Sequence, residues 1–270
     1  MGRDMQSDAL DRVLSVLGYL TRILVYFGLL LPAIIIILVS FTRGQSMDFP
    51  PDGFSLQWYE NAFASRQFMG ALWESLQLAT LATIAVLIIG AAAAYGIVRY
   101  RFRGSALFQS IALSPMIIPV ILLGLGLLQL FAWAGFARSS MMLFTGHLVI
   151  MLPYVVRTLI TGLMLFDTRL EQAAQNLRAP PFRVFRKITL PLLVPSLITA
   201  SIFAFVTSFG NVTLSSILAV SGTATLPVQM FTYVEYSNDP IVAAVSTLVI
   251  AITTALILII EKVIGVDKLF

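Results

Sequence analysis

Six apolar runs, each long enough to cross a bilayer, dominate this sequence of 270 residues. A transmembrane helix needs about 20 mostly apolar residues, and a backbone in lipid must satisfy its own hydrogen bonds, so such runs fold as helices. Only 11% of the residues are charged, against roughly 25% in a soluble domain. We therefore predict an all-α membrane protein, one transmembrane domain over residues 1–270. Its six predicted spans are residues 16–40, 72–98, 106–133, 141–165, 192–218 and 241–260.

A polar interval, residues 167–191, separates the fourth and fifth runs and holds five of the seventeen basic residues. Thr168 and Glu171 have the spacing of a capping box, in which each side chain bonds the backbone N–H of the other residue. Pro180-Pro181 then ends this first helix and can begin a second one. The interval therefore predicts a short helix, a sharp turn and an amphipathic helix. The apolar face of that second helix is predicted from Phe182, Phe185, Ile188 and Thr189.

The distribution of basic residues predicts the topology. Three lie in the N-terminal segment, three in the loop after the second run, five in the interval 167–191 and two at the C-terminus, thirteen in all, and three lie in the opposite loops. Because cytoplasmic loops carry the excess of Lys and Arg, both termini and the interval are predicted to be cytoplasmic. The basic residues are not arrayed with aromatic residues as binding of single-stranded nucleic acid requires, so we predict no nucleic-acid partner.

The interval also carries a long motif, Glu171-x-Ala173-Ala174-x-x-Leu177-x-Ala179, followed by Ile188-x-Leu190-Pro191. This pattern resembles the EAA motif of the permeases of binding-protein-dependent ABC importers. The chain also shares with that family a Leu-x-Trp-Tyr element ending at Tyr59 and a basic turn ending at Gly104. Within the family it is most similar to the C-type permease subunits of spermidine/putrescine transporters.

The resemblance implies a type I importer permease in the bacterial inner membrane. Residues 167–191 would form a coupling helix that docks onto a separate ATPase. The implied partners are a second homologous permease, two ATPase subunits that bind ATP and Mg²⁺, and a periplasmic substrate-binding protein. The family usually has glycine where this chain has Arg178, so the tight turn there lacks its usual residue, and Pro180-Pro181 are candidates to replace it. The residues that the resemblance assigns to ATPase coupling are Glu171, Ala173, Ala174, Leu177, Arg178, Ala179 and Pro191.

Common catalytic motifs are missing from the sequence. The sequence has no Gly-x-x-x-x-Gly-Lys-Ser/Thr phosphate loop and no His-Glu-x-x-His zinc helix, so we predict neither ATP hydrolysis by this chain nor a bound metal. It has no cysteine and one histidine, His147, for which a hydrogen bond to a neighbouring helix is the expected role. No carboxylate falls in the middle of a predicted span, which makes an ATP-independent secondary carrier the weaker alternative.

Candidate residues for the transport path lie in two runs. Pro115 and Pro119 interrupt the third run, and broken helices are tolerated in membranes where they line a cavity or are packed by protein. In the fifth run the candidates form a polar, glycine-containing stretch, for which hydrogen bonding between helices is an equal alternative. They are Ser208, Phe209, Gly210, Asn211 and Thr213. Candidate outer contacts are the carboxylates Glu74, Glu235 and Asp239.

Arg157 is an ionisable residue within the fourth run, which makes it a functional hypothesis by default. Pairing with the interval 167–191, or partial snorkelling, is the structural alternative. The best candidate solute is a polyamine, on the resemblance alone. Polyamine permeases of this type have acidic residues where this chain has Gly210-Asn211, and related permeases import amino acids, opines, aminophosphonates or ferric iron, so these alternatives stay open.

Overall fold

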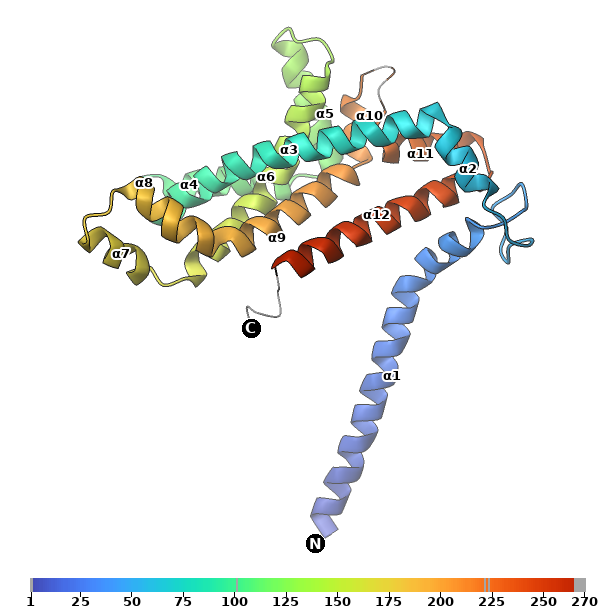
Figure 1. The fold of residues 1–270 in the computed structure, drawn as a ribbon, viewed down its shortest axis with the longest axis horizontal. Coiled ribbons are helices and arrows are strands. Elements are labelled where there is room, and N and C mark those ends of the chain that lie inside the picture. The colour runs from blue at the N-terminus through green and yellow to red at the C-terminus, as the bar shows by residue number, and fades with distance from the viewer. Residues whose placement is uncertain (1, 101, 221, 223, 265–270) are drawn as a thin grey trace. The chain divides into compact units, whose positions relative to one another are not determined.

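The computed structural model describes residues 2–264 except 101, 221 and 223, and all of its regular structure is helical. The all-α prediction is therefore confirmed for the described residues (Figure 1). Four helices are long and apolar enough to cross a membrane, namely Leu14–Val39, Arg66–Arg99, Ser140–Leu165 and Pro181–Phe209. A bent pair over residues 105–133 supplies a possible fifth, and the last run forms α12, Ile241–Ile264. The count of six spans stays a prediction.

The chain divides into two compact units. The first unit contains α1, Gly2–Val39, and α2, Gln57–Ala64. Tyr59 shares a 2.6 Å hydrogen bond with Ser40, and the indole N–H of Trp58 donates to the carbonyl of Gly44 over 3.2 Å. Trp58 is only 6% exposed. The two aromatic residues of the Leu-x-Trp-Tyr element therefore fasten α2 to the end of α1.

The second unit is built around α3, Arg66–Arg99, α6, Ser140–Leu165, and α9, Leu190–Phe209, which pack against one another. Small residues allow the close approach, as they commonly do between membrane helices. A Cβ atom at Gly90 would lie 2.6 Å from Val155 Cγ1, and one at Gly162 would overlap Ser196. This packing creates the core, in which Met151, Leu159 and Leu193 are buried.

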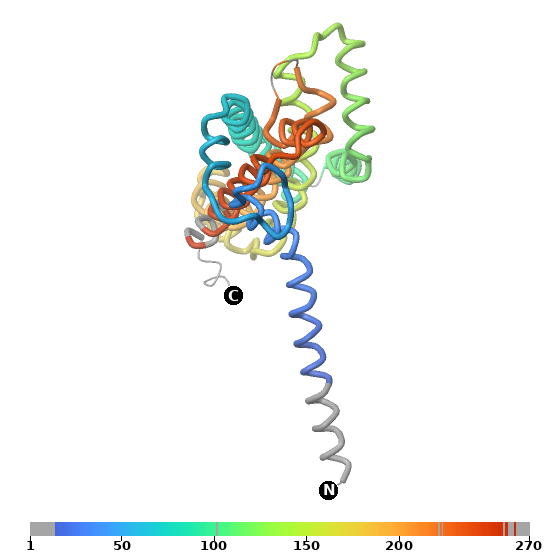
Figure 2. The backbone as a smooth tube through the Cα atoms, turned by 90° about the vertical axis from the view of Figure 1, so that its right-hand side faces the viewer, coloured from blue at the N-terminus to red at the C-terminus, as the bar shows by residue number. Residues whose placement is uncertain are grey.

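The third predicted span, residues 106–133, is not one continuous helix. It consists of α4, Ser105–Leu113, a 3₁₀ turn η1, Ser114–Met116, and α5, Val120–Trp133, with a bend of 108° between the two apolar parts. Figure 2 shows the two helices as separate rods. The physical cause lies in Pro115 and Pro119, since proline has no N–H for the helical ladder and disfavours helical geometry in the residue before it.

The fifth predicted span, residues 192–218, is likewise divided. Helix α9 ends at Phe209, and α10, Thr213–Leu218, starts anew because Asn211 Oδ1 accepts a 2.8 Å hydrogen bond from the backbone N–H of Leu214. Between the fifth and sixth predicted spans lies a further helix, α11, Leu226–Tyr236. The first N–H of α11 donates to Ser75 on α3 over 2.7 Å, which anchors this helix to the second unit.

Candidate functional site

The polar interval folds as predicted into two short helices with a turn between them. Helix α7 covers Arg169–Asn176, α8 covers Pro181–Val184, and a π-helical turn η2, Phe185–Thr189, leads into α9 (Figure 1). The predicted capping box is wrong. Thr168 makes no side-chain capping bond, and Asp167 Oδ1 instead accepts a 2.9 Å bond from the backbone N–H of Arg169.

Glu171 does not return to the N-terminus of its own helix because it has stronger partners elsewhere. Its Oε1 accepts a 2.6 Å hydrogen bond from the hydroxyl of Thr189, and its Oε2 lies 2.9 Å from Arg99 Nε. Glu171 is 7% exposed. The carboxylate thereby joins the first helix of the interval to its last turn and both to the end of α3.

Arg99 is the cation that holds this arrangement. Besides Glu171, its guanidinium donates to the carbonyl of Leu163 over 3.2 Å and lies 4.8 Å from the ring centre of Phe166. The sequence indicated Arg99 only as part of a topology signal. No local pattern could have paired it with Glu171, because the pairing depends on the packing of α3 against α6.

The turn between α7 and α8 forms without glycine. The N–H of Ala179 bonds the carbonyl of Ala174 over 3.1 Å, and the N–H of Arg178 bonds that of Gln175 over 2.9 Å, the two bonds of a Schellman motif. Arg178 has a φ of 58°, in the left-handed region that glycine ordinarily occupies. The missing glycine therefore leaves the turn intact, at a cost of about 1 kcal/mol in backbone strain.

The side of the interval that faces away from the helical core exposes apolar and basic side chains. Leu177 is 85% and Phe182 73% exposed, and Leu170 and Ala173 are also exposed, while Ala174 and Ala179 are half-buried. Phe182 was expected on the packed face of the second helix, but Val184 is buried there instead, since the π-helical turn changes the helical register. Pro191 lies exposed in the first turn of α9.

The predicted path residues of the fifth run are not equivalent. Ser208 is buried and bonds His147 Nδ1 over 2.8 Å, and His147 Nε2 bonds Ser215 over 3.1 Å, so the histidine joins neighbouring helices as expected. Phe209 is buried with its ring stacked on Phe205. The residues with more open positions are Gly210 and Thr213, both exposed, and the half-buried Asn211. At the break in the third run, Pro119 is exposed and Pro115 half-buried.

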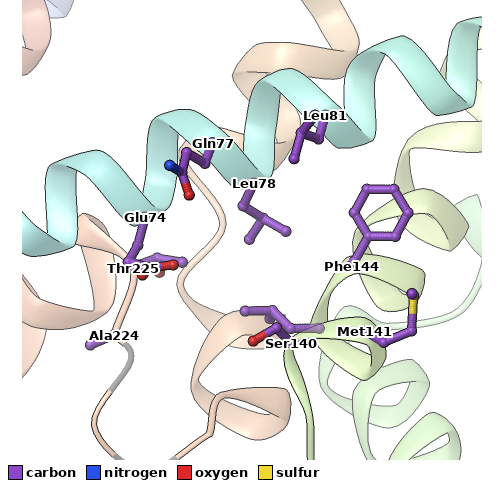
Figure 3. A pocket seen from close by; sticks show the side chains of 10 residues that line it. Glu74, Gln77, Leu78, Leu81, Ser140, Met141, Phe144, Ala224 and Thr225 are labelled. Carbon is purple, nitrogen blue, oxygen red and sulfur yellow. The ribbon is translucent and has the colours of Figure 1, made fainter.

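Of the predicted outer contacts, Glu74 is exposed at a cavity of about 440 Å³ that the sequence did not reveal. Glu74, Gln77 and Leu78 line it from α3 (Figure 3). Met141 and Phe144 line it from α6, and its surface is mainly apolar. Glu235 is exposed on α11, and Asp239 is half-buried in the first unit. In the described part of the chain no three His, Asp or Glu residues gather as a metal site would require.

In the described part of the chain, Arg157 does not pair with the interval 167–191. It lies exposed on α6, and the side chain that pairs with the interval 167–191 is that of Arg99. The carbonyl of Arg157 accepts a hydrogen bond from the hydroxyl of Thr161 over 3.1 Å.

These features define a helical membrane protein whose polar loop, residues 167–191, is bonded to the helical core on one side and exposed on the other. Residues 86–265 match the family described as the inner membrane component of binding-protein-dependent transport systems, and the chain belongs to this family. Members are transporter subunits that work with a substrate-binding protein and an ATPase. The resemblance seen in the sequence is thereby confirmed.

Relatives extend over most of the chain. It is 32% identical to the spermidine/putrescine permease PotC of Haemophilus influenzae, over 86% of this chain and 90% of that protein. It is 27% identical to PhnV of Salmonella paratyphi A, named for 2-aminoethylphosphonate transport, over 91% and 93% of the two chains. A bacterial alginate ABC transporter, solved with a pentasaccharide-bound periplasmic protein, has a chain of the same fold, with a TM-score of 0.72, 15% identity and coverage of 94% and 95%.

Proposed function

We propose that this chain forms half of the translocation path of a bacterial importer, together with a second homologous permease. Two ATPase subunits would bind ATP and Mg²⁺ on its cytoplasmic side, and a periplasmic binding protein would deliver the solute. The chain crosses the inner membrane six times, with both termini and residues 167–191 in the cytoplasm, as the thirteen basic residues on that side support.

The proposal rests on the difference between the two sides of residues 167–191, one of which is bonded to the helical core while the other is exposed. The inner side is fixed by Glu171, Arg99 and Thr189, and the outer side presents Leu177 and Phe182. An exposed apolar patch of this kind marks a protein contact. Because the loop is tied to α3 and to the end of α6, a movement of a docked ATPase is transmitted directly to the transmembrane helices. The ATPase must bind the loop differently in its two nucleotide states, since otherwise no equilibrium shifts.

The imported solute is a small molecule with an ammonium group. The names of the relatives supply two such classes, polyamines and 2-aminoethylphosphonate, and both share a primary amine on a short alkyl chain. The carboxylate of Glu74, at the cavity between α3 and α6, is the group best placed to meet that amine first.

The test replaces Leu177, which is exposed on the side of the loop that faces away from the helical core. Leu177→Asp should weaken recovery of the ATPase with the purified complex by roughly 30-fold, since a central interface side chain contributes about 2 kcal/mol. Leu56→Asp is the matched control, because Leu56 is also an exposed leucine but lies beside α2 in the other unit. Equal ATPase recovery and equal ATP-dependent uptake in both variants would contradict the docking role of Leu177, whereas uptake that needs no ATP would favour an ATP-independent carrier.

A further inference from the structure

Helix α6 carries a polar stripe on the side that its own chain leaves uncovered. Tyr154, Arg157 and Thr161 are exposed there, Tyr154 to 38%. Residues three, four and seven apart lie on one face of a helix. Other faces of α6 are closed, since Val155, Val156 and Leu159 are fully buried. The stripe is therefore a defined surface of this helix.

A second exposed stripe, on α3, is apolar throughout. It is formed by Ile84, Ile88 and Ile89, all large and apolar. Acyl chains offer no hydrogen bonds, so a surface that meets them consists of such residues. The stripe on α6 has a phenol, a guanidinium and a hydroxyl instead, so we infer that it does not face lipid.

Arg157 is poorly placed for snorkelling. It is eight residues from the end of α6, about 12 Å at 1.5 Å per residue. The Cα–Cβ bonds of a helix tilt toward its N-terminus, so the side chain starts in the direction of the more distant end, deeper in the membrane. Arginine stays protonated in proteins. In the described part of the chain no carboxylate lies within ion-pair distance of it.

We propose that the stripe Tyr154–Arg157–Thr161 lines the water-filled path and that Arg157 binds an anionic group of the transported solute. This inference rests on the proposed importer function and narrows its solute class. A guanidinium binds carboxylate or phosphonate oxygens with paired N–H donors. The Thr161 hydroxyl gives its proton to the Arg157 carbonyl, which leaves its oxygen free to accept a bond from an ammonium group.

The solute is therefore a small amine that also bears a carboxylate or a phosphonate. A polyamine has only positive groups and would be repelled by Arg157. No carboxylate offsets that charge in the described middle of the spans: Glu74 lies near the start of α3, and Glu171 is held by Arg99. Between the two classes suggested by the relatives, the stripe favours the zwitterionic one.

The first experiment measures the electrostatic potential at the stripe without any solute. The chain has no cysteine, so Thr161→Cys provides its only thiol in the assembled importer, built with cysteine-free partner subunits. Anionic sulfonatoethyl and cationic trimethylammonioethyl methanethiosulfonate should both modify it from water. The ratio of the anionic to the cationic rate should fall on the order of a hundredfold when Arg157→Gln is added, because unit charges ~6 Å apart at a dielectric constant of ~40 change each of the two rates about tenfold in opposite directions.

Ile88→Cys on the apolar stripe of α3 is the matched control and should resist both reagents. An unreactive Thr161→Cys would mean that another subunit or lipid covers the stripe, and this outcome overturns the proposal. A rate ratio that Arg157→Gln leaves unchanged overturns it as well, because Arg157 would then not set the charge preference of the path.

The second experiment tests the solute class with labelled putrescine and spermidine in proteoliposomes that contain the whole importer. We expect uptake of neither, and ATP-driven uptake of either one by the unaltered complex overturns the anionic assignment. ATP hydrolysis by the complex with Leu177→Asp is measured in parallel. If it equals that of the unaltered complex, the proposed function is contradicted. The thiol modification of Thr161→Cys reports on the stripe independently of that result.

Discussion

Arg99 and Arg157 belong to the same compact unit, but the fold treats their charges in opposite ways. Arg99, the last residue of α3, has a carboxylate at 2.9 Å, a carbonyl at 3.2 Å and an aromatic ring at 4.8 Å. Arg157 lies about two turns inside α6, is exposed and has no ion-pair partner among the described residues. The more deeply placed cation is therefore the one with fewer partners.

This difference separates the polar residues that hold the fold from those that await another molecule. A charge in or near a membrane is expensive unless it is paired or meets water. Arg99 meets that requirement within the chain, as does His147 through its two serine partners. Arg157 can meet it only through water, solute or another subunit. Substitutions of the first kind should therefore affect stability and coupling, and those of the second kind should affect transport.

The largest effect is expected from Glu171→Lys, which turns the partnered Arg99 into an unpaired cation beside a second one. Breaking a buried ion pair costs about 3–5 kcal/mol, so ATP-dependent uptake should be lost and the thermal midpoint of the purified complex should fall. Both are measured on the same preparation, by proteoliposome uptake and by a fluorescence melt.

Gln172→Lys is the matched control, since it adds the same charge to an exposed neighbour on α7. It should retain most of the uptake. The double exchange Arg99→Glu with Glu171→Arg should restore part of the stability. If Gln172→Lys is as harmful as Glu171→Lys, charge at the docking surface is the cause and the internal pair is not.

The second largest effect is expected on the side of α6 that packs against α9. Gly162→Val places side-chain atoms where Ser196 and Leu193 of α9 already lie. Overpacking of this kind costs about 1–3 kcal/mol, so the thermal midpoint should fall clearly. Gly126→Val on α5 is the control, because nothing lies within 4 Å of that position. Equal midpoints for the two variants would show that α6 and α9 are not held in this close contact.

A smaller effect is expected from His147→Leu, which removes two hydrogen bonds between helices. Such bonds contribute about 1 kcal/mol in membrane proteins, and the freed serines can bond carbonyls of their own helices. We expect a modest decrease in the thermal midpoint. Ser216→Ala should leave it unchanged, because Ser216 bonds only the carbonyl of Val212 in its own helix. A larger decrease for Ser216→Ala would contradict the role given to His147.

Local patterns predicted the features of this chain that depend on local chemistry. Apolar run length placed the long helices, and Pro181 was correctly expected to begin the second helix of the interval. The capping box failed because Glu171 finds a stronger partner on α3, which the spacing of Thr168 and Glu171 does not reveal.

The missed features all depend on residues that are distant in the sequence or on breaks within apolar runs. The division at Asn211 lies inside a segment whose hydropathy alone predicts one helix, whereas the interruption of the third run at Pro115 and Pro119 was expected. Helix α11 falls between two predicted spans, and its start is fixed by Ser75 on α3, which no local pattern reveals. For the candidate site, the EAA motif identified the loop, but Arg99 could be recognised as its anchor only in three dimensions.

The smallest change in stability is expected from Arg157→Gln, and this expectation separates the two arginines most directly. Replacing an exposed side chain that has no partner alters stability by about 0.5 kcal/mol or less, so the thermal midpoint of the complex should stay within error. Arg99→Gln should lower it, since Glu171 would remain buried without its cation. If Arg157→Gln destabilises the complex as much as Arg99→Gln does, Arg157 must be paired with another subunit. Its exposure in the single chain would then mark an interface between permeases, and the transport path would have to be sought on another face of the second unit.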